Sequence, residues 1–233
     1  MKPRVVLKIT GEALKGKDNA FDRRALDFLA DEIKSVCDLV SLAVVIGGGN
    51  IVRGRYLIKE FQTTPAVADH IGMTATILNA ALVEDFLQRE GIDTRLMSAV
   101  PIDMVAEKYV FKRALRHLER GRVVILAGGT GNCGVTTDTA AILRAYDLRA
   151  ERVLKGTKVD GVYSEDPNLN PDATLFPRIS YNEFLARNLS GILDETAVAE
   201  AKAKKISIHV FNIFEKGNLF KAISGEPMGS VIS

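Results

Sequence analysis

The chain has 233 residues, of which 47% are hydrophobic and 26% charged, a composition typical of a soluble globular protein. Its formal net charge is +2, with acidic and basic residues interspersed. This charge pattern argues against a nucleic-acid partner, because nucleic-acid binders usually carry a basic stripe or tail. No stretch approaches about 18 consecutive apolar residues, so we expect no membrane-spanning segment and no membrane partner.

The two cysteines, Cys37 and Cys133, have neither CxxC nor zinc-type spacing. We therefore expect two free thiols in a reducing compartment. The first residues lead into a strand-like run rather than into the apolar core of a signal peptide. These features together predict a cytoplasmic protein.

Short apolar runs alternate with segments of helical spacing along the whole chain. In the first part, the sequence predicts strand 5–9, helix 22–36, strand 43–46, helix 69–88, strand 94–97, helix 112–119, strand 123–127 and helix 137–147. The second part predicts strand 152–155, a loop rich in Asp, Pro and Asn up to residue 177, helices 181–189 and 194–204, strand 208–211 and a last strand at 231–232.

This alternation predicts an α/β fold, a three-layer αβα sandwich around a mostly parallel central sheet. We expect a single domain over residues 1–233. Because the loop-rich segment begins near residue 150, we also expect two approximate lobes, 1–150 and 151–233.

Glycine-rich turns follow three of the predicted strands, at residues 10–11, 47–49 and 128–131. Ligands of α/β sheets bind beyond the carboxyl ends of the strands, and glycine lets backbone N–H groups approach phosphate oxygens closely. The turns therefore indicate a polyphosphate or two phosphorylated ligands; the alternative is that they are only tight connections. The chain has no GxxxxGK[ST] pattern, and no GxGxxG opens its first helix, which excludes a P-loop kinase and an ordinary dinucleotide-binding dehydrogenase.

Three basic residues could lie among these glycines: Lys8, Arg53 and Lys155. Lys8 interrupts an otherwise apolar strand. It either extends along the edge of the sheet to reach solvent, or it places its ammonium at the carboxyl end of the strand, facing a phosphate. Phosphoryl transfer requires mainly alignment and neutralisation of charge, which lysine, arginine and backbone amides can supply.

A series of short segments keeps a fixed order and spacing along the chain. They are residues 7–14 (LKITGEAL), 45–54 (VIGGGNIVRG), 69–73 (DHIGM), 95–101 (RLMSAVP), 130–132 (TGN), 136–138 (TTD), 155–163 (KGTKVDGVY) and 166–167 (DP). In combination they resemble the bacterial UMP kinases of the amino-acid kinase superfamily. The resemblance implies transfer of the γ-phosphoryl group of ATP to UMP, giving UDP and ADP in pyrimidine nucleotide biosynthesis.

The resemblance also implies roles for individual residues. The implied catalytic residues are Lys8, Arg53, Asp138, Lys155 and Asp194. The implied ATP-binding residues are Lys8, Ile9, Thr10, Gly11, Gly49, Arg53, Thr157, Tyr163 and Asp166. The implied UMP-binding residues are Gly48, Asp69, Thr130, Gly131, Asn132, Cys133, Gly134, Val135, Thr136 and Thr137.

Two of the implied residues have an alternative structural role. Asp69 would accept hydrogen bonds from the UMP ribose, and Asp194 would help Asp138 to organise the lysines and Mg²⁺; each could also be a helix N-cap. The resemblance implies Mg²⁺ as cofactor, held mainly by nucleotide phosphates and water rather than by protein ligands. It also implies a homohexamer as the assembled form.

The sequence departs from the family pattern at two places. Residues 133–135 (CGV) replace a proline and two aromatic residues, which puts base selectivity and subunit contacts there in doubt. Residues 15–21 are short and differ from the segment where many members bind the activator GTP, so GTP regulation is not carried over.

Three alternatives remain at this point. The first is a related kinase that acts on a carboxylate, a carbamate or isopentenyl phosphate, which the segments 69–73 and 130–132 disfavour. The second is a nucleotide-binding storage or regulatory protein on the same fold, which the four residues Lys8, Arg53, Asp138 and Lys155 disfavour. The third is an α/β scaffold whose glycine turns bind nothing.

Overall fold

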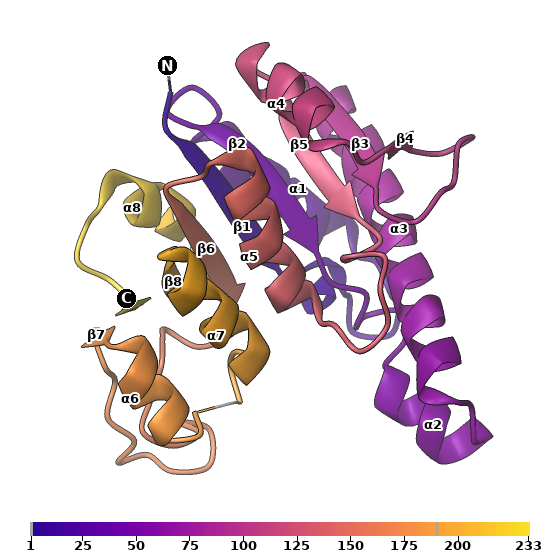
Figure 1. The fold of residues 1–233 in the computed structure, drawn as a ribbon. Coiled ribbons are helices and arrows are strands. Elements are labelled where there is room, and N and C mark those ends of the chain that lie inside the picture. The colour runs from indigo at the N-terminus through magenta and orange to yellow at the C-terminus, as the bar shows by residue number, and fades with distance from the viewer. Residues whose placement is uncertain (1, 190) are drawn as a thin grey trace.

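The computed structural model describes residues 2–189 and 191–233, which form three layers with a sheet in the middle (Figure 1). Its nine strands lie in the order β4-β3-β5-β2-β1-β6-β8-β9-β7. The strands are β1 (Arg4–Ile9), β2 (Ser41–Ile46), β3 (Thr94–Ser98), β4 (Glu107–Lys108), β5 (Val123–Ala127), β6 (Arg152–Thr157), β7 (Arg178–Ile179), β8 (Ser207–Asn212) and β9 (Ser230–Ile232). Strands β8 and β9 pair antiparallel, and the other described pairs are parallel.

Helices cover both faces of this sheet. They are α1 (Arg23–Lys34), α2 (Gly54–Phe61), α3 (Pro65–Arg89), α4 (Phe111–Glu119), α5 (Thr137–Leu148), α6 (Tyr181–Ala186), α7 (Glu195–Lys204) and α8 (Asn218–Ser224), with a 3₁₀ turn, η1, at Gly11–Leu14. One hydrophobic core joins α1, α3 and α8 to the sheet, and a second joins α4, α5, α6 and α7 to the opposite face. The predicted fold class, a three-layer sandwich with a mostly parallel sheet, is confirmed.

Local capping explains most helix boundaries. Asp22 caps α1 by accepting hydrogen bonds from the N–H groups of Arg24 and Ala25. Helix α3 begins at Pro65, four residues before the predicted start, because Thr64 caps it and proline suits the first helical position.

Two helices were not predicted from the sequence. Helix α2 contains no buried residue, and its main packing partner is α3. Helix α8 follows Gly217, which has no side chain to signal a cap. Its first N–H groups are instead satisfied by Glu32 of α1, which is distant in sequence.

The alternation of side chains along β1 explains the place of Lys8. Val5, Leu7 and Ile9 face the core that contains α1 and α3, while Val6 faces the core that contains α5. Lys8 therefore lies on the same face as Val6, toward α5. On the neighbouring strand β6, Lys155 is the parallel register partner of Lys8 and lies on the same face.

Helix α3 is long and apolar enough to cross a membrane by length and composition alone. It packs against β3 and β5, and 44% of its most apolar stretch is buried. The structure therefore gives this helix the position of a covering helix of the sheet. The division into lobes near residue 150 falls between β1 and β6, which are paired strands of one continuous sheet, and it stays a prediction.

Candidate active site

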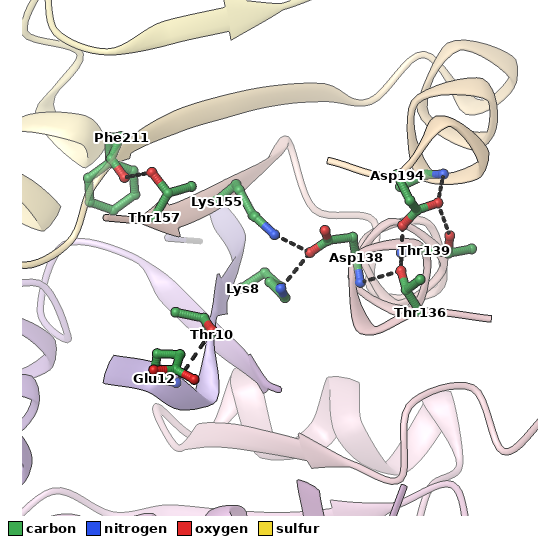
Figure 2. A network of polar contacts seen from close by, with 11 residues as sticks. Lys8, Thr10, Glu12, Thr136, Asp138, Thr139, Lys155, Thr157, Asp194 and Phe211 are labelled. Carbon is green, nitrogen blue, oxygen red and sulfur yellow. Dashed lines mark hydrogen bonds and ion pairs between the residues drawn. The ribbon is translucent and has the colours of Figure 1, made fainter. Parts of the chain in front are cut away.

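The polar centre of the site is a carboxylate between two lysines. Asp138, in the first turn of α5, accepts from the Lys8 ammonium at 2.6 Å and from the Lys155 ammonium with the same oxygen. Figure 2 shows both ammonium groups pointing toward the Asp138 carboxylate. Parallel register brings the two lysines together, and the start of α5 supplies the charge that holds them there.

Burial and charge both act on this cluster. The two lysine residues are each 6% exposed. Burial and the neighbouring Lys8 ammonium lower the pKa of Lys155 from its ordinary value of 10.5 to about 7. Burial raises the pKa of Asp138, but the Lys8 and Lys155 ammonium groups outweigh burial and keep that pKa below its ordinary value. The cluster therefore holds two cations and one anion when fully charged.

A cavity of about 540 Å³ opens on one side of the two lysines. It collects most of the predicted ATP-binding residues, namely Lys8, Thr10, Arg53, Thr157, Tyr163 and Asp166. Thr157 shapes its wall, because the Thr157 hydroxyl donates to the Val159 carbonyl at 2.6 Å and accepts from the Val159 N–H at 3.2 Å. Ile9 and Gly11, which were also predicted to bind ATP, are chain neighbours of the lining residues but do not line the cavity themselves.

A second cavity, of about 170 Å³, lies on the other side of the Arg53 segment. Its walls include Gly48, Asp69, Asn132, Val135 and Thr137 from the predicted UMP-binding set. Gly49, which was predicted to bind ATP, also lines this smaller cavity and not the larger one. Arg53 lines the larger cavity, whereas its chain neighbours Val52 and Gly54 line the smaller one, so the two cavities are adjacent. Asp138 follows Thr137 of the smaller cavity in the chain and binds the two lysines of the larger one, so it lies close to both cavities.

The acceptor loop after β5 is held against α3. The Asp69 carboxylate accepts a hydrogen bond from the Gly134 N–H at 2.6 Å. The Cys133 thiol lies 3.6 Å from the Ala66 carbonyl oxygen and 3.5 Å from His70 Nε2. Asp69 is not the N-cap of α3, a position that Thr64 occupies. At residues 133–135, where the family pattern has a proline and two aromatic residues, the small Cys133 side chain therefore faces α3.

Asp194 is the N-cap of α7, where it accepts from the Ala197 N–H at 2.8 Å. It also accepts from the hydroxyls of Thr136 and Thr139, and these contacts tie α7 to the start of α5 (Figure 2). The structure places Asp194 against these threonines rather than against the lysines. It reaches the lysines only indirectly, because Thr136 in turn caps the helix that carries Asp138.

Glu12 and Lys158 are among the residues of the larger cavity to which the sequence assigned no role. Glu12 binds Arg53 at 2.6 Å and Lys158 at 3.4 Å, so a carboxylate bridges two cations at the cavity wall. Partial burial raises the pKa of Glu12, but the hydrogen bond from Arg53 and the Lys158 charge outweigh it and lower that pKa. Both residues stand inside segments that the sequence analysis singled out, and the position of Glu12 directly after the first glycine turn was the available signal.

The glycine loop after β2 offers unpaired backbone donors. In the part of the chain that the structure describes, the N–H groups of Gly48 and Gly49 have no protein acceptor. A Cβ on Gly48 would lie 2.9 Å from the Ala75 Cβ, so only glycine allows this close approach to α3. Free N–H groups on the wall of a cavity are suited to an anion such as a phosphate.

The residues present do not build a metal cage of their own. Among residues 2–189 and 191–233, no three His, Cys, Asp or Glu side chains cluster closely enough to hold a metal ion. Mg²⁺ usually keeps several waters and binds through substrate phosphates with one or two carboxylates at most. Asp138 is the carboxylate of the lysine cluster, and Mg²⁺ held mainly by nucleotide phosphates stays a prediction.

Fold and site together define an α/β protein with two neighbouring cavities, the larger of which is lined by a buried lysine pair. The family model described as the amino acid kinase family matches residues 3–212. The chain belongs to the amino acid kinase family.

Solved structures with the same fold agree over the whole chain. A UMP kinase from Bacillus anthracis is 35% identical, with a TM-score of 0.95 over 99% of this chain and 96% of that one. A UMP kinase from Ureaplasma parvum is 32% identical, with a TM-score of 0.94 over 100% and 99%. A uridylate kinase from Archaeoglobus fulgidus is 30% identical, with a TM-score of 0.75 over 100% of both chains.

Proposed function

We propose that this protein is a UMP kinase, which transfers the γ-phosphoryl group of ATP to UMP and gives ADP and UDP in pyrimidine nucleotide biosynthesis. The observation that carries the proposal is that Lys8 and Lys155, both held by Asp138, line the larger cavity, while Thr137, the chain neighbour of Asp138, lines the smaller one. ATP occupies the larger cavity and UMP the smaller one. The likeness to UMP kinases over the full chain supports this choice of acceptor.

Transfer requires positioning and charge neutralisation more than covalent chemistry. A phosphate oxygen of UMP attacks the γ-phosphorus; the new P–O bond forms as the bond to the β-phosphate oxygen breaks. No general base is needed, because a phosphate monoester is already anionic near neutral pH. Lys8 and Lys155 neutralise charge on the transferring group, and the free N–H groups of Gly48 and Gly49 bind phosphate oxygens.

Mg²⁺ enters with ATP in this proposal, and when bound it neutralises part of the triphosphate charge. Asp138 keeps the two ammonium groups aimed at the junction of the cavities. Thr157, Tyr163 and Asp166 bind the adenosine, where the ring of Tyr163 supports the base. Asp69 binds the ribose of UMP and gives up its bond to Gly134 when it does so.

A coupled assay of ADP formation tests the proposal, with ATP, Mg²⁺ and, separately, UMP, dUMP, CMP and isopentenyl phosphate. We expect turnover with UMP well above turnover with the other acceptors. Faster turnover with another acceptor would mean that the loop at residues 133–135 has redirected the smaller cavity. No turnover with any of them would favour a binding protein without catalysis.

We further propose a cytoplasmic homohexamer. The free thiols of Cys37 and Cys133 support a reducing compartment. Exposed apolar side chains gather on α2 and α3 and support a subunit interface there, namely Tyr56, Ile58, Phe61, Val67, Ile71 and Leu78. Light scattering coupled to size-exclusion chromatography measures the assembled mass, and a monomer would contradict the proposal.

A further inference from the structure

Helix α3 carries two buried polar side chains one turn apart, Thr76 and Asn79. Thr76 is 3% exposed and Asn79 is fully buried at 0%. Buried polar groups are costly unless they are hydrogen-bonded, so their partners show what these side chains hold in place. Both face the sheet rather than solvent, and each contacts a different glycine loop.

Asn79 is bound to both ends of the loop after β2. Its side-chain amide donates to the Gly47 carbonyl at 2.7 Å and to the Asn50 side-chain oxygen at 2.7 Å. The Asn50 amide donates back to the Asn79 oxygen at 3.0 Å and to the Ala20 carbonyl at 2.9 Å. All four amide N–H bonds are used, and they fix the two loop positions that flank Gly48 and Gly49.

Thr76 is bound to the start of the loop after β5. Its hydroxyl accepts from the Gly128 N–H at 2.8 Å and donates to the Met73 carbonyl at 2.7 Å. Strands β2 and β5 are neighbours in the sheet. Helix α3 thus holds two adjacent glycine loops. Gly48 and Gly49 of one loop and Gly129 of the other line the smaller cavity.

We propose that Asn79 and Thr76 are positioning residues that set the place of the acceptor phosphate. The inference rests on the proposed function and deepens it. Asn79 touches neither cavity, so it acts through Gly47 and Asn50, which hold the free N–H groups of Gly48 and Gly49 toward the acceptor. Thr76 differs in that it also lines the smaller cavity, and its hydroxyl fixes the Gly128 N–H at the start of the loop after β5. Losing either bond leaves a loop free to shift, and alignment of the acceptor is lost with it.

The cleanest test is Thr76→Val, which keeps the shape of the side chain and removes the hydroxyl. We expect KM for UMP to rise about tenfold, the size of effect of leaving one buried partner unsatisfied, while KM for ATP stays within about twofold. Thr76→Ser restores a hydroxyl and is expected to restore KM for UMP. An unchanged KM for UMP in Thr76→Val would overturn the role of Thr76.

For Asn79, the test pairs Asn79→Ala with Val83→Ala, a buried hydrophobic core residue one turn further along the same helix. Both variants are expected to lower Tm, but only Asn79→Ala is expected to raise KM for UMP, again about tenfold. Equal KM values in the two variants, at similar Tm, would show that Asn79 only supports the fold.

Hydrogen exchange of the Ile51 and Val52 amides, which both donate to the Gly48 carbonyl, gives a readout that needs no turnover. Asn79→Ala is expected to speed exchange there at least severalfold, and Val83→Ala to leave it unchanged. If the unaltered protein does not phosphorylate UMP, the proposed function is wrong. The exchange measurement still shows whether Asn79 holds the loop after β2 in place. Equal protection in the two variants would overturn the inference.

Discussion

At the scale of single residues, the site depends on the buried charges of Lys8, Asp138 and Lys155. Because these side chains are buried, the charge of each strongly affects the energy of the other two. Asp138 accepts from two ammonium groups, and each of the two lysine residues is 6% exposed. Removing one member leaves the others buried and uncompensated, which costs more than the loss of one contact. The three side chains are therefore expected to act as a unit.

In the proposed mechanism, Lys8→Ala removes a cation from the transferring phosphate, and Asp138→Asn removes the charge that holds both lysines. We expect each to lower kcat on the order of 100-fold or more, as for loss of one stabilising donor at a transition state. Steady-state kinetics measures kcat, with circular dichroism as the control for folding. Near-normal turnover in both folded variants would contradict the assignment.

Lys155 gives the site a dependence on pH. Its pKa of about 7 means that the free protein loses this positive charge as pH rises through 7. A bound triphosphate favours the charged form and raises the pKa again, so ATP binding at pH 8 is expected to take up a proton. Calorimetry in two buffers of different ionisation enthalpy measures that uptake. Lys155→Met is expected to abolish it, and absence of uptake in the unaltered protein would rule out the shift.

At the scale of elements, a residue distant in sequence caps a helix that has no local capping side chain. Glu32 of α1 accepts from the Gly217 N–H at 2.6 Å and the Leu219 N–H at 3.1 Å, and so caps α8. This contact joins the first helix of the chain to the last one.

Glu32→Ala is expected to destabilise the protein by about 1–3 kcal/mol, because it leaves these N–H groups unsatisfied. Glu32→Gln keeps an acceptor and serves as the matched control, with a smaller loss expected. Urea unfolding of both variants measures the free energies of unfolding. Equal stability of Glu32→Ala and the unaltered protein would show that α8 does not need this cap.

The sequence predicts elements best where the signal is local. Strand 123–127 and the helix after Asp194 carry their own apolar run or cap, and both are present as β5 and α7. Helix α8 is capped by Glu32, which is distant in sequence. The hydrogen bond from Asn79 to Gly47 likewise joins residues 32 positions apart. Neither contact leaves a local sequence pattern. The pairing of Lys8 with Lys155 follows only from the register of β1 and β6.

At the scale of the whole molecule, the sheet order explains why the site is where it is. Strands β5, β2, β1 and β6 are consecutive neighbours, so the loops that leave their carboxyl ends lie side by side. The first three carry the glycine turns and the fourth carries Lys155 and Thr157. The two cavities therefore share one edge of the sheet, with α3 beside the smaller one and the loop after β6 beside the larger one.

The central claim is that ATP and UMP meet across the Lys8–Asp138–Lys155 cluster. A crystal structure of the protein with UMP and a non-hydrolysable ATP analogue tests it most directly. The account predicts the γ-phosphate at Lys8 and Lys155, the adenine near Tyr163 and the UMP phosphate at the Gly48 N–H. A UMP phosphate bound away from the Gly48 loop, or a triphosphate that does not reach the two lysines, would contradict it.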